Sequence, residues 1–354
     1  MTTSLQLKLY FTIKPDGTVR AERLYGRSHL AALPSFVGGR PLTEGAPYLF
    51  SAARDGEPEG ETVYLEAEDL FLRPDGDGPV TDGPLSFREW ESLPEHFDPE
   101  EMKKPICGPE LVSVLFPDSV KRLGRYTFYN CDGLRHLRMS ADLRDIGGGS
   151  FNGCRKVTDL TFRLGADEKS GLRELLTELN ETLAVHLFYA EEETERARIV
   201  FPEYFEEAIE NTPARQLETR VHGCGHRYRY CFHDKAFLFA EYDGLFPWLM
   251  EQERASLAAE VAITRLRFPF RLSEEARKRY EGFLAEGSDA IARLWLKEKA
   301  VENLKFLALL PGLKEEKLSQ MIDLARESGR TEFTGWLMET RHKRFPAQKR
   351  RFSF

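Results

Sequence analysis

The chain of 354 residues is 41% hydrophobic and 31% charged, a composition typical of a soluble globular protein with one large domain or two to three ordinary ones. Its formal net charge of −8 argues against general binding to DNA or RNA, because neutralising phosphates requires a basic surface. No stretch reaches the roughly 18 to 20 apolar residues that span a bilayer, and the first residues lack the apolar run of a signal peptide, so we expect a cytoplasmic protein without a membrane span.

The N-terminal residues instead predict a β-strand, in which Leu5, Leu7, Leu9 and Phe11 point to one side. The five cysteines are an odd number, and their spacing does not fit a small disulfide framework. We therefore expect reduced thiols, most of them buried.

A repeat occupies residues 111–162, where the sequence matches itself at an offset of 23 residues without a gap. The matching positions are Leu111, Leu134 and Val157; Val114, Leu137 and Leu160; Phe116, Met139 and Phe162; Val120 and Leu143; Leu123 and Ile146; Gly124 and Gly147; Phe128 and Phe151; and Cys131 and Cys154. A period in this range, with one short strand in each unit, indicates a leucine-rich solenoid. One unit cannot bury its own apolar face, so successive units must stack, and we interpret Cys131 and Cys154 as interior packing residues.

The pattern LxxVxFPDSVxxLGxxTFxNCxxLxxL resembles the BspA-type leucine-rich repeat, whose units are similar to LxxIxIPxxVxxIGxxAFxxCxxL. A degenerate copy at 16–51 has Pro34 before a loop, Leu42 eight residues before Phe50, and Gly45-Ala46 in place of the usual Ile-Gly pair. The resemblance covers about 1–165 and implies a solenoid fold and no particular activity. An acidic insertion rich in Gly and Pro interrupts it at about 52–108, and there 62–65 and 70–72 fit a hairpin.

Residues 166–243 predict an α+β connecting region. The apolar spacing over 172–183 is that of a helix, and the apolar runs 184–189 and 198–201 fit a hairpin. A short helix is predicted after Pro202, ended by Pro213.

Residues 244–345 predict a helical region with apolar faces of helical period. The predicted helices are 245–268, 273–286, 288–309, 314–328 and 331–344. Their short connections favour antiparallel helix pairs, as in an α-solenoid or a small bundle. The combination also resembles bacterial proteins that join such repeats to a helical C-terminal region.

The segment HGCGHRYRYCFHD, 222–234, concentrates metal-ligating residue types, and its candidate metal ligands are His222, Cys224, His226, Cys231 and His233. As a strand, the segment places His222, Cys224 and His226 on one face, where three ligands in a row are strained. As a helix from about Gly225, it scatters the histidines, and neither geometry gathers four ligands. A reactive pair of Cys224 with His222 or His226 is the nucleophilic alternative, and Gly223 and Gly225 favour a tight turn with positive φ.

The last fourteen residues, RHKRFPAQKRRFSF, interleave six Lys or Arg with three Phe. They fit either a basic helix end followed by a tail at 346–354, or a docking segment for nucleic acid, an acidic partner or anionic lipid. Arg350 and Arg351 are the candidate residues in this tail, and Lys121, Arg135 and Arg138 are the candidate partner-binding residues of the repeats.

The sequence therefore predicts an α+β fold, a short interrupted leucine-rich-repeat solenoid followed by a helical C-terminal region. No motif for nucleotide binding, metal hydrolysis or serine catalysis is present, so we expect no cofactor and no catalytic residues. The first hypothesis is a non-catalytic scaffold that binds another protein. The alternatives are an enzyme or metal protein centred on 222–233, and binding through the basic tail.

Overall fold

The computed structural model describes residues 5–54, 56–68, 86–140, 142–189, 194–211 and 216–346. The chain forms two compact units, Met1–Leu238 and Phe239–Phe354, and each is described by itself. The connecting region predicted at 166–243 is therefore divided, and most of it belongs to the first unit.

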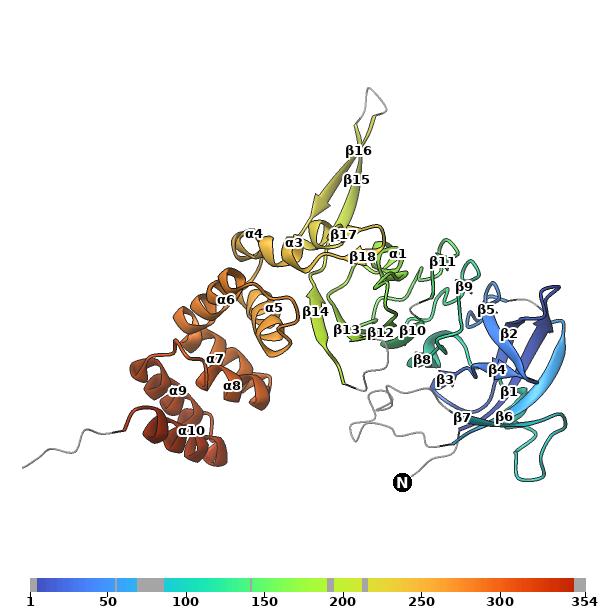
Figure 1. Cartoon of the computed structure of the whole chain (residues 1–354), viewed down its shortest axis with the longest axis horizontal. Helices are drawn as coiled ribbons and strands as arrows, with labels where there is room; N and C mark the ends of the chain where they lie inside the picture. The colour runs from blue at the N-terminus through green and yellow to red at the C-terminus, as the bar shows by residue number, and fades with distance from the viewer. Residues whose placement is uncertain are drawn as a thin grey trace, which may run out of the picture. The chain divides into compact units, whose positions relative to one another are not determined.

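One large sheet of the first unit carries the repeats (Figure 1). Its strand order is β14 (Ala197–Phe201), β13 (Leu183–Tyr189), β12 (Asp159–Leu164), β10 (His136–Ser140), β8 (Ser113–Leu115) and β3 (Leu30–Ala32). The strands from β3 to β13 are parallel, and β14 closes the sheet as an antiparallel strand. The solenoid thus continues past residue 165, because β13 pairs in parallel with β12.

The second large sheet lies on the other side of the repeat turns. It contains β11 (Asp145–Ile146), β9 (Arg122–Leu123), β5 (Arg40–Gly45), β2 (Val19–Tyr25), β1 (Leu5–Ile13), β6 (Glu61–Glu68) and β7 (Ser86–Trp90) in that order, with β4 (Phe36–Val37) paired to β5. Strands β2, β5, β9 and β11 are parallel, whereas β1, β6 and β7 extend the sheet by antiparallel pairing.

In the first sheet, the strands pair so that equivalent residues of successive repeats lie beside one another. One inward row runs across its strands and consists of Ala31, Val114, Leu137, Leu160, Val185 and Ile199. None of these side chains is more than 2% exposed. The predicted match of Val114, Leu137 and Leu160 is therefore confirmed, as is the predicted N-terminal strand with its buried Leu5, Leu7, Leu9 and Phe11.

The repeat turns stack their phenylalanines in the core. Phe128 is fully buried, and its ring is stacked on Phe50 with 5.5 Å between centroids and on Phe151 with 5.0 Å. The thiol of Cys131 donates to the Phe50 carbonyl, and the thiol of Cys154 donates to the Phe128 carbonyl. The degenerate copy predicted at 16–51 is thus a turn of the solenoid, with Gly45 in register with Leu123.

The insertion after residue 52 adds strands to the second sheet. As predicted, 62–65 lies in a strand, β6, which pairs with β1 and with β7. The hairpin partner of β6 is Ser86–Trp90, while the predicted partner 70–72 lies outside the described residues.

Two predictions after residue 165 need correction. The helix predicted at 172–183 is α1 (Leu172–Glu178), and Leu183 already belongs to β13. The short helix predicted after Pro202 is wrong, because β15 (Phe205–Asn211) pairs with β16 (Gln216–His222) as a hairpin. Apolar residues at 204, 205, 208 and 209 match a helical spacing, but a strand partner outside that window satisfies the backbone instead.

The second unit is helical, as predicted. Its helices are α3 (Phe239–Gly244), α4 (Phe246–Gln252), α5 (Ala255–Arg267), α6 (Glu274–Glu286), α7 (Ser288–Lys297), α8 (Val301–Ala308), α9 (Glu315–Glu327) and α10 (Thr331–Arg344). The helix predicted at 288–309 is interrupted at Lys299, whose φ of 62° lies in the left-handed region. Arg265 donates to both oxygens of Asp243 at 2.8 and 2.9 Å, and the Tyr280 hydroxyl donates to the same buried carboxylate. Within the described part of the chain, no helix is long and apolar enough to cross a membrane.

The stacked phenylalanines give the first test. We expect Phe128→Ala to lower the free energy of unfolding by about 3–5 kcal/mol, because the change leaves a cavity between two stacked rings. Denaturant unfolding followed by circular dichroism measures the loss. Phe36→Ala is the control, since the Phe36 side chain is 56% exposed and its removal should have little effect. Equal stability of the two variants would contradict the packing described here.

Candidate functional site

The outward face of the second sheet carries a row of charges. Thr12, Arg20, Glu44, Arg122 and Asp145 are aligned across β1, β2, β5, β9 and β11, one residue from each strand. We call Arg20, Glu44, Arg122 and Asp145 the charged row. Because the strands alternate their side chains, the neighbouring Leu123 and Ala21 point into the core and the charges point outward.

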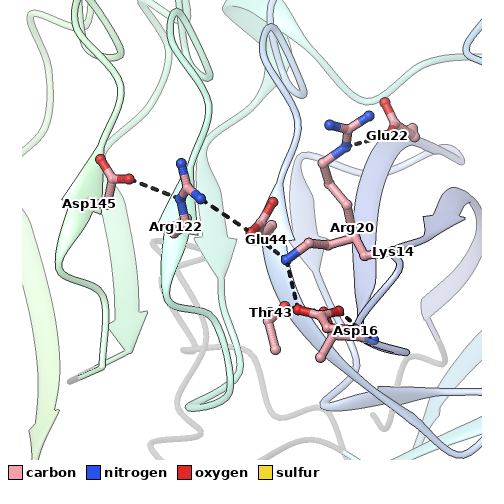
Figure 2. Close-up of polar contacts among 9 residues, drawn as sticks. Lys14, Asp16, Arg20, Glu22, Thr43, Glu44, Arg122 and Asp145 are labelled. Atoms are coloured by element: carbon pink, nitrogen blue, oxygen red, sulfur yellow. Dashed lines mark hydrogen bonds and ion pairs between the residues drawn. The ribbon is translucent and has the colours of Figure 1, made fainter.

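The charges alternate in sign, and Arg122 is paired along the row with Glu44 and Asp145, whereas Arg20 is paired with Glu22 of its own strand (Figure 2). Arg122 Nε lies 2.9 Å from an Asp145 oxygen, and an Arg122 terminal nitrogen lies 3.8 Å from Glu44. Lys14 Nζ lies 2.6 Å from Glu44, and this hydrogen bond raises the pKa of the Lys14 ammonium. Exposed pairs of this kind contribute little stability, so the row defines the charge pattern of the face more than it holds the fold together.

Aromatic side chains form a second row on the same face. Tyr25, Lys8, Tyr64 and Trp90 are aligned across β2, β1, β6 and β7, and we call them the aromatic row. The Lys8 ammonium lies 4.6 Å from the ring centre of Tyr10, 5.9 Å from that of Tyr25 and 6.0 Å from that of Tyr64. All four members of the row are half-buried. The Lys8 ammonium donates to the Tyr10 hydroxyl at 2.9 Å, and the negative faces of the rings attract the cation.

The Trp90 end of the aromatic row is supported from the segment after β7. Phe97 is buried, and its ring centre lies 5.6 Å from that of Trp90 and 6.4 Å from that of Tyr64. Tyrosine, tryptophan and paired arginine are the side chains enriched in protein–protein interfaces. The arrangement therefore has the side-chain types of a protein-binding surface.

Sequence reasoning missed both rows. One signal was available, because Arg122 and Asp145 occupy the same position of successive repeats, 23 residues apart. The aromatic row carried no such signal, since its members meet only after β6 and β7 have joined β1 across the insertion.

The partner-binding residues predicted in the repeats differ in their exposure to solvent. Lys121 and Arg135 are exposed, and Lys121 adjoins the charged row, where its backbone N–H donates to the Thr43 carbonyl. A partner-binding residue must be accessible, but the Arg138 side chain is only 5% exposed and lies 3.6 Å from Asp118. It lies between Leu115 and Thr161 in a row across the first sheet. Arg350 and Arg351 lie outside the described residues.

A second polar cluster lies on the first sheet and was not predicted. Asp159 accepts hydrogen bonds from His136, from His186 and from the Thr158 hydroxyl, and His186 also contacts Glu195 at 2.9 Å. Burial would raise the pKa of Asp159, but these hydrogen bonds outweigh it and lower the pKa. Likewise, the hydrogen bonds to Asp159 and Glu195 outweigh the effect of burial on His186 and raise its pKa. Both ring nitrogens of His186 face carboxylate oxygens, an arrangement that favours the protonated ring, in which both nitrogens donate.

The segment 222–234 is neither a continuous strand nor one long helix. Strand β16 ends at His222, Gly223 turns the chain with φ of 83°, and α2 (Gly225–Tyr228) follows. The short strands β17 (Phe232–His233) and β18 (Ala236–Phe237) then pair. The helix expected from about Gly225 is therefore present for one turn. A positive φ is found at Gly223, whereas Gly225 is needed for close approach, because a Cβ there would lie 2.0 Å from the Pro202 carbonyl oxygen.

The histidines of this segment point to different neighbours. The His222 ring stacks on Phe205 and contacts Glu207 at 3.0 Å, while His226 packs against Tyr204 and Tyr230. His233 is exposed, and Cys224 and Cys231 are buried. Across the residues that the structure describes, no group of three or more His, Cys, Asp or Glu side chains could hold a metal ion.

Arg229 gives this segment a structural role. Its guanidinium is 1% exposed and donates to the carbonyl oxygens of Leu176, Leu179, Glu181, Pro202 and Gly225. The Tyr204 ring covers it at 4.8 Å, and burial lowers its pKa to about 10. One cation thus satisfies the carbonyl groups at the end of α1 and after β14, which would otherwise be buried without a partner.

Thiol labelling tests the nucleophile alternative. Burial raises the pKa of Cys154 to about 12, and burial also raises that of Cys131, while Cys224 and Cys231 are buried. Cys107 is the half-buried cysteine, so we expect it to react first with a thiol reagent in the native protein, although burial raises its pKa too. Mass spectrometry locates the label, and Cys107→Ser should abolish native labelling. Fast labelling of Cys224 would instead support a reactive Cys–His pair.

The His186 cluster predicts a pH dependence of stability. A histidine whose folded pKa is raised above its ordinary value of 6.5 stabilises the fold fully below that value, and the contribution is lost as the pH rises through the folded pKa. We therefore expect the difference in unfolding free energy between the wild type and His186→Gln to shrink as the pH rises above about 6.5. His233→Gln, at an exposed position, is the control. A difference that is constant with pH would contradict a raised pKa.

The comparisons with known proteins agree with the geometry of the repeats. Residues 107–169 match the family described as "BspA type Leucine rich repeat region (6 copies)". No curated protein and no solved structure matches the chain. The matched range contains β8 to β12, whose parallel strands repeat in register, as the resemblance implies. Residues 107–169 are therefore a BspA-type leucine-rich repeat region, within a β-solenoid that a helical unit follows in the chain.

Proposed function

We propose that the chain is a non-catalytic scaffold that binds a partner protein on the outward face of the second sheet. The observation that carries the proposal is the presence of the aromatic row and the charged row on the same outward face of the second sheet. Leucine-rich-repeat regions commonly bind proteins, which supports the same class of function.

The charge pattern favours a protein over a nucleic acid. Arg20 and Arg122 alternate along the charged row with Glu44 and Asp145, so the row offers no continuous basic strip for phosphates. A protein surface with mixed charges can match this pattern, and it can bury the half-exposed rings of Tyr25, Tyr64 and Trp90 at the centre of an interface.

The remaining polar groups favour a non-catalytic role. The His186 imidazole is held between two carboxylates, and Arg229 is enclosed by carbonyl groups. Both therefore serve the fold in the arrangement described above. We assign no substrate and no cofactor.

The test begins with capture of partners from a lysate on the immobilised full chain, followed by purification of a captured protein and calorimetric titration. We expect Tyr64→Ala and Arg122→Glu each to weaken binding about tenfold or more, because interface tyrosines and arginines carry a large share of binding energy.

Matched control variants make this test specific. Arg155→Glu and Tyr129→Ala change the same residue types at accessible positions in the repeat turns, away from the face, and should bind as the wild type does. A captured partner that binds all four variants equally would show that the face is not the binding site.

A further inference from the structure

The hairpin of β15 and β16, which we call the arm, stands away from the rest of the first unit (Figure 1). The two strands pair with each other over seven residues, and among the described strands neither pairs with any other. Both outer edges of the arm thus present backbone N–H and C=O groups to a further strand.

Most of the arm's side chains whose burial the structure describes are exposed. Residues 205–208 and 219–221 are all exposed, with 57% exposure at Phe205 and 44% at Val221. An isolated two-stranded hairpin with no buried face is marginally stable in water. The arm therefore has the properties of an element that is completed by another strand.

The sequence of β16 indicates which strand pairs with the free edge of the arm. Gln-Leu-Glu-Thr-Arg-Val-His, 216–222, is complementary to itself when it is paired antiparallel with a second copy around Thr219. In that register Arg220 of one chain is opposite Glu218 of the other, and Leu217 is opposite Val221. Opposite charges and apolar pairs that face each other across strands are both stabilising.

Strand β15 does not have this property. An antiparallel pairing with its own copy around Ala208 sets Glu206 opposite Glu210, and like charges directly opposite are destabilising. The two edges of the arm therefore differ, and the edge formed by β16 is the one that is complementary to its own copy.

We propose that two copies of this chain dimerise through the arm, by antiparallel pairing of β16 with β16 around a two-fold axis at Thr219. The product is a four-stranded antiparallel sheet in the order β15-β16-β16-β15. Within each protomer Arg220 is already opposite Glu207, so the dimer places it between two carboxylates, one from each chain. This interface is isologous and closes on itself, so association stops at two copies. It involves a separate two-stranded sheet and no strand of the charged or aromatic row, and it does not depend on the proposed partner binding.

Exchanging the charges at the proposed interface tests the pairing. Light scattering coupled to gel filtration measures the mass of the full chain and of each variant. We expect the wild type to have twice the monomer mass of 40.7 kDa. Arg220→Glu places Glu opposite Glu218 and should give a monomer, as should Glu218→Arg. The double variant Arg220→Glu/Glu218→Arg restores opposite charges and should be a dimer again. Glu206→Arg, on β15, is the matched control and should remain dimeric.

A cysteine at the axis provides an independent measurement. Thr219→Cys brings two copies of the thiol opposite each other, so mild oxidation should cross-link the chains, whereas Ala208→Cys on β15 should give no cross-link. A wild type that is monomeric throughout the micromolar range overturns the proposal. So does a dimer that survives Arg220→Glu, or a double variant that stays monomeric, because each of these outcomes excludes self-pairing around Thr219.

Discussion

The structure of the first unit depends on the in-register stacking of its turns. Each strand from β3 to β13 pairs in parallel with its neighbour without a shift, so equivalent residues of successive turns lie directly beside one another. Because side chains alternate across a strand, a slip of one residue would move the row of Val114 and Leu137 from the core to the surface. The same register that buries these residues aligns Glu44, Arg122 and Asp145 on the outside.

The candidate interaction face combines two kinds of strand. The charged row is carried mainly by the parallel strands β5, β9 and β11 of the solenoid, and the aromatic row is carried by the antiparallel strands that extend the same sheet. The insertion between the first turn and the second is therefore part of the face, because it supplies Tyr64 and Trp90. The face would lose its aromatic half if the insertion were only a surface loop.

Buried arginines donate hydrogen bonds to backbone carbonyl groups in places where the regular repeat does not continue. Arg23 donates to the carbonyls of Tyr48, Leu49 and Ser51 in the first turn, and Arg229 does the same at the end of the solenoid. In the helical unit, Arg344 donates to the carbonyls of Leu310 and Leu313. Carbonyl groups in irregular backbone lack the ladder partners of strands, and a guanidinium with five donors can satisfy several of them at once. This requirement accounts for two residues of the segment 222–234, since Gly225 makes room for the backbone that Arg229 binds.

The sequence by itself determined the solenoid, its 23-residue unit and the helical C-terminal region, because these follow from local periodicity and from contacts between neighbouring repeats. It also placed Cys131 and Cys154 in the core, at equivalent positions of the repeat. Only the tertiary structure decided that Phe205–Asn211 is a strand, that Arg138 is buried, and that Tyr25, Lys8, Tyr64 and Trp90 share one row. The first depends on pairing with the next strand along the chain, and the other two depend on neighbouring strands that tertiary packing brings together. None of these contacts leaves a periodic trace in the residues that it involves.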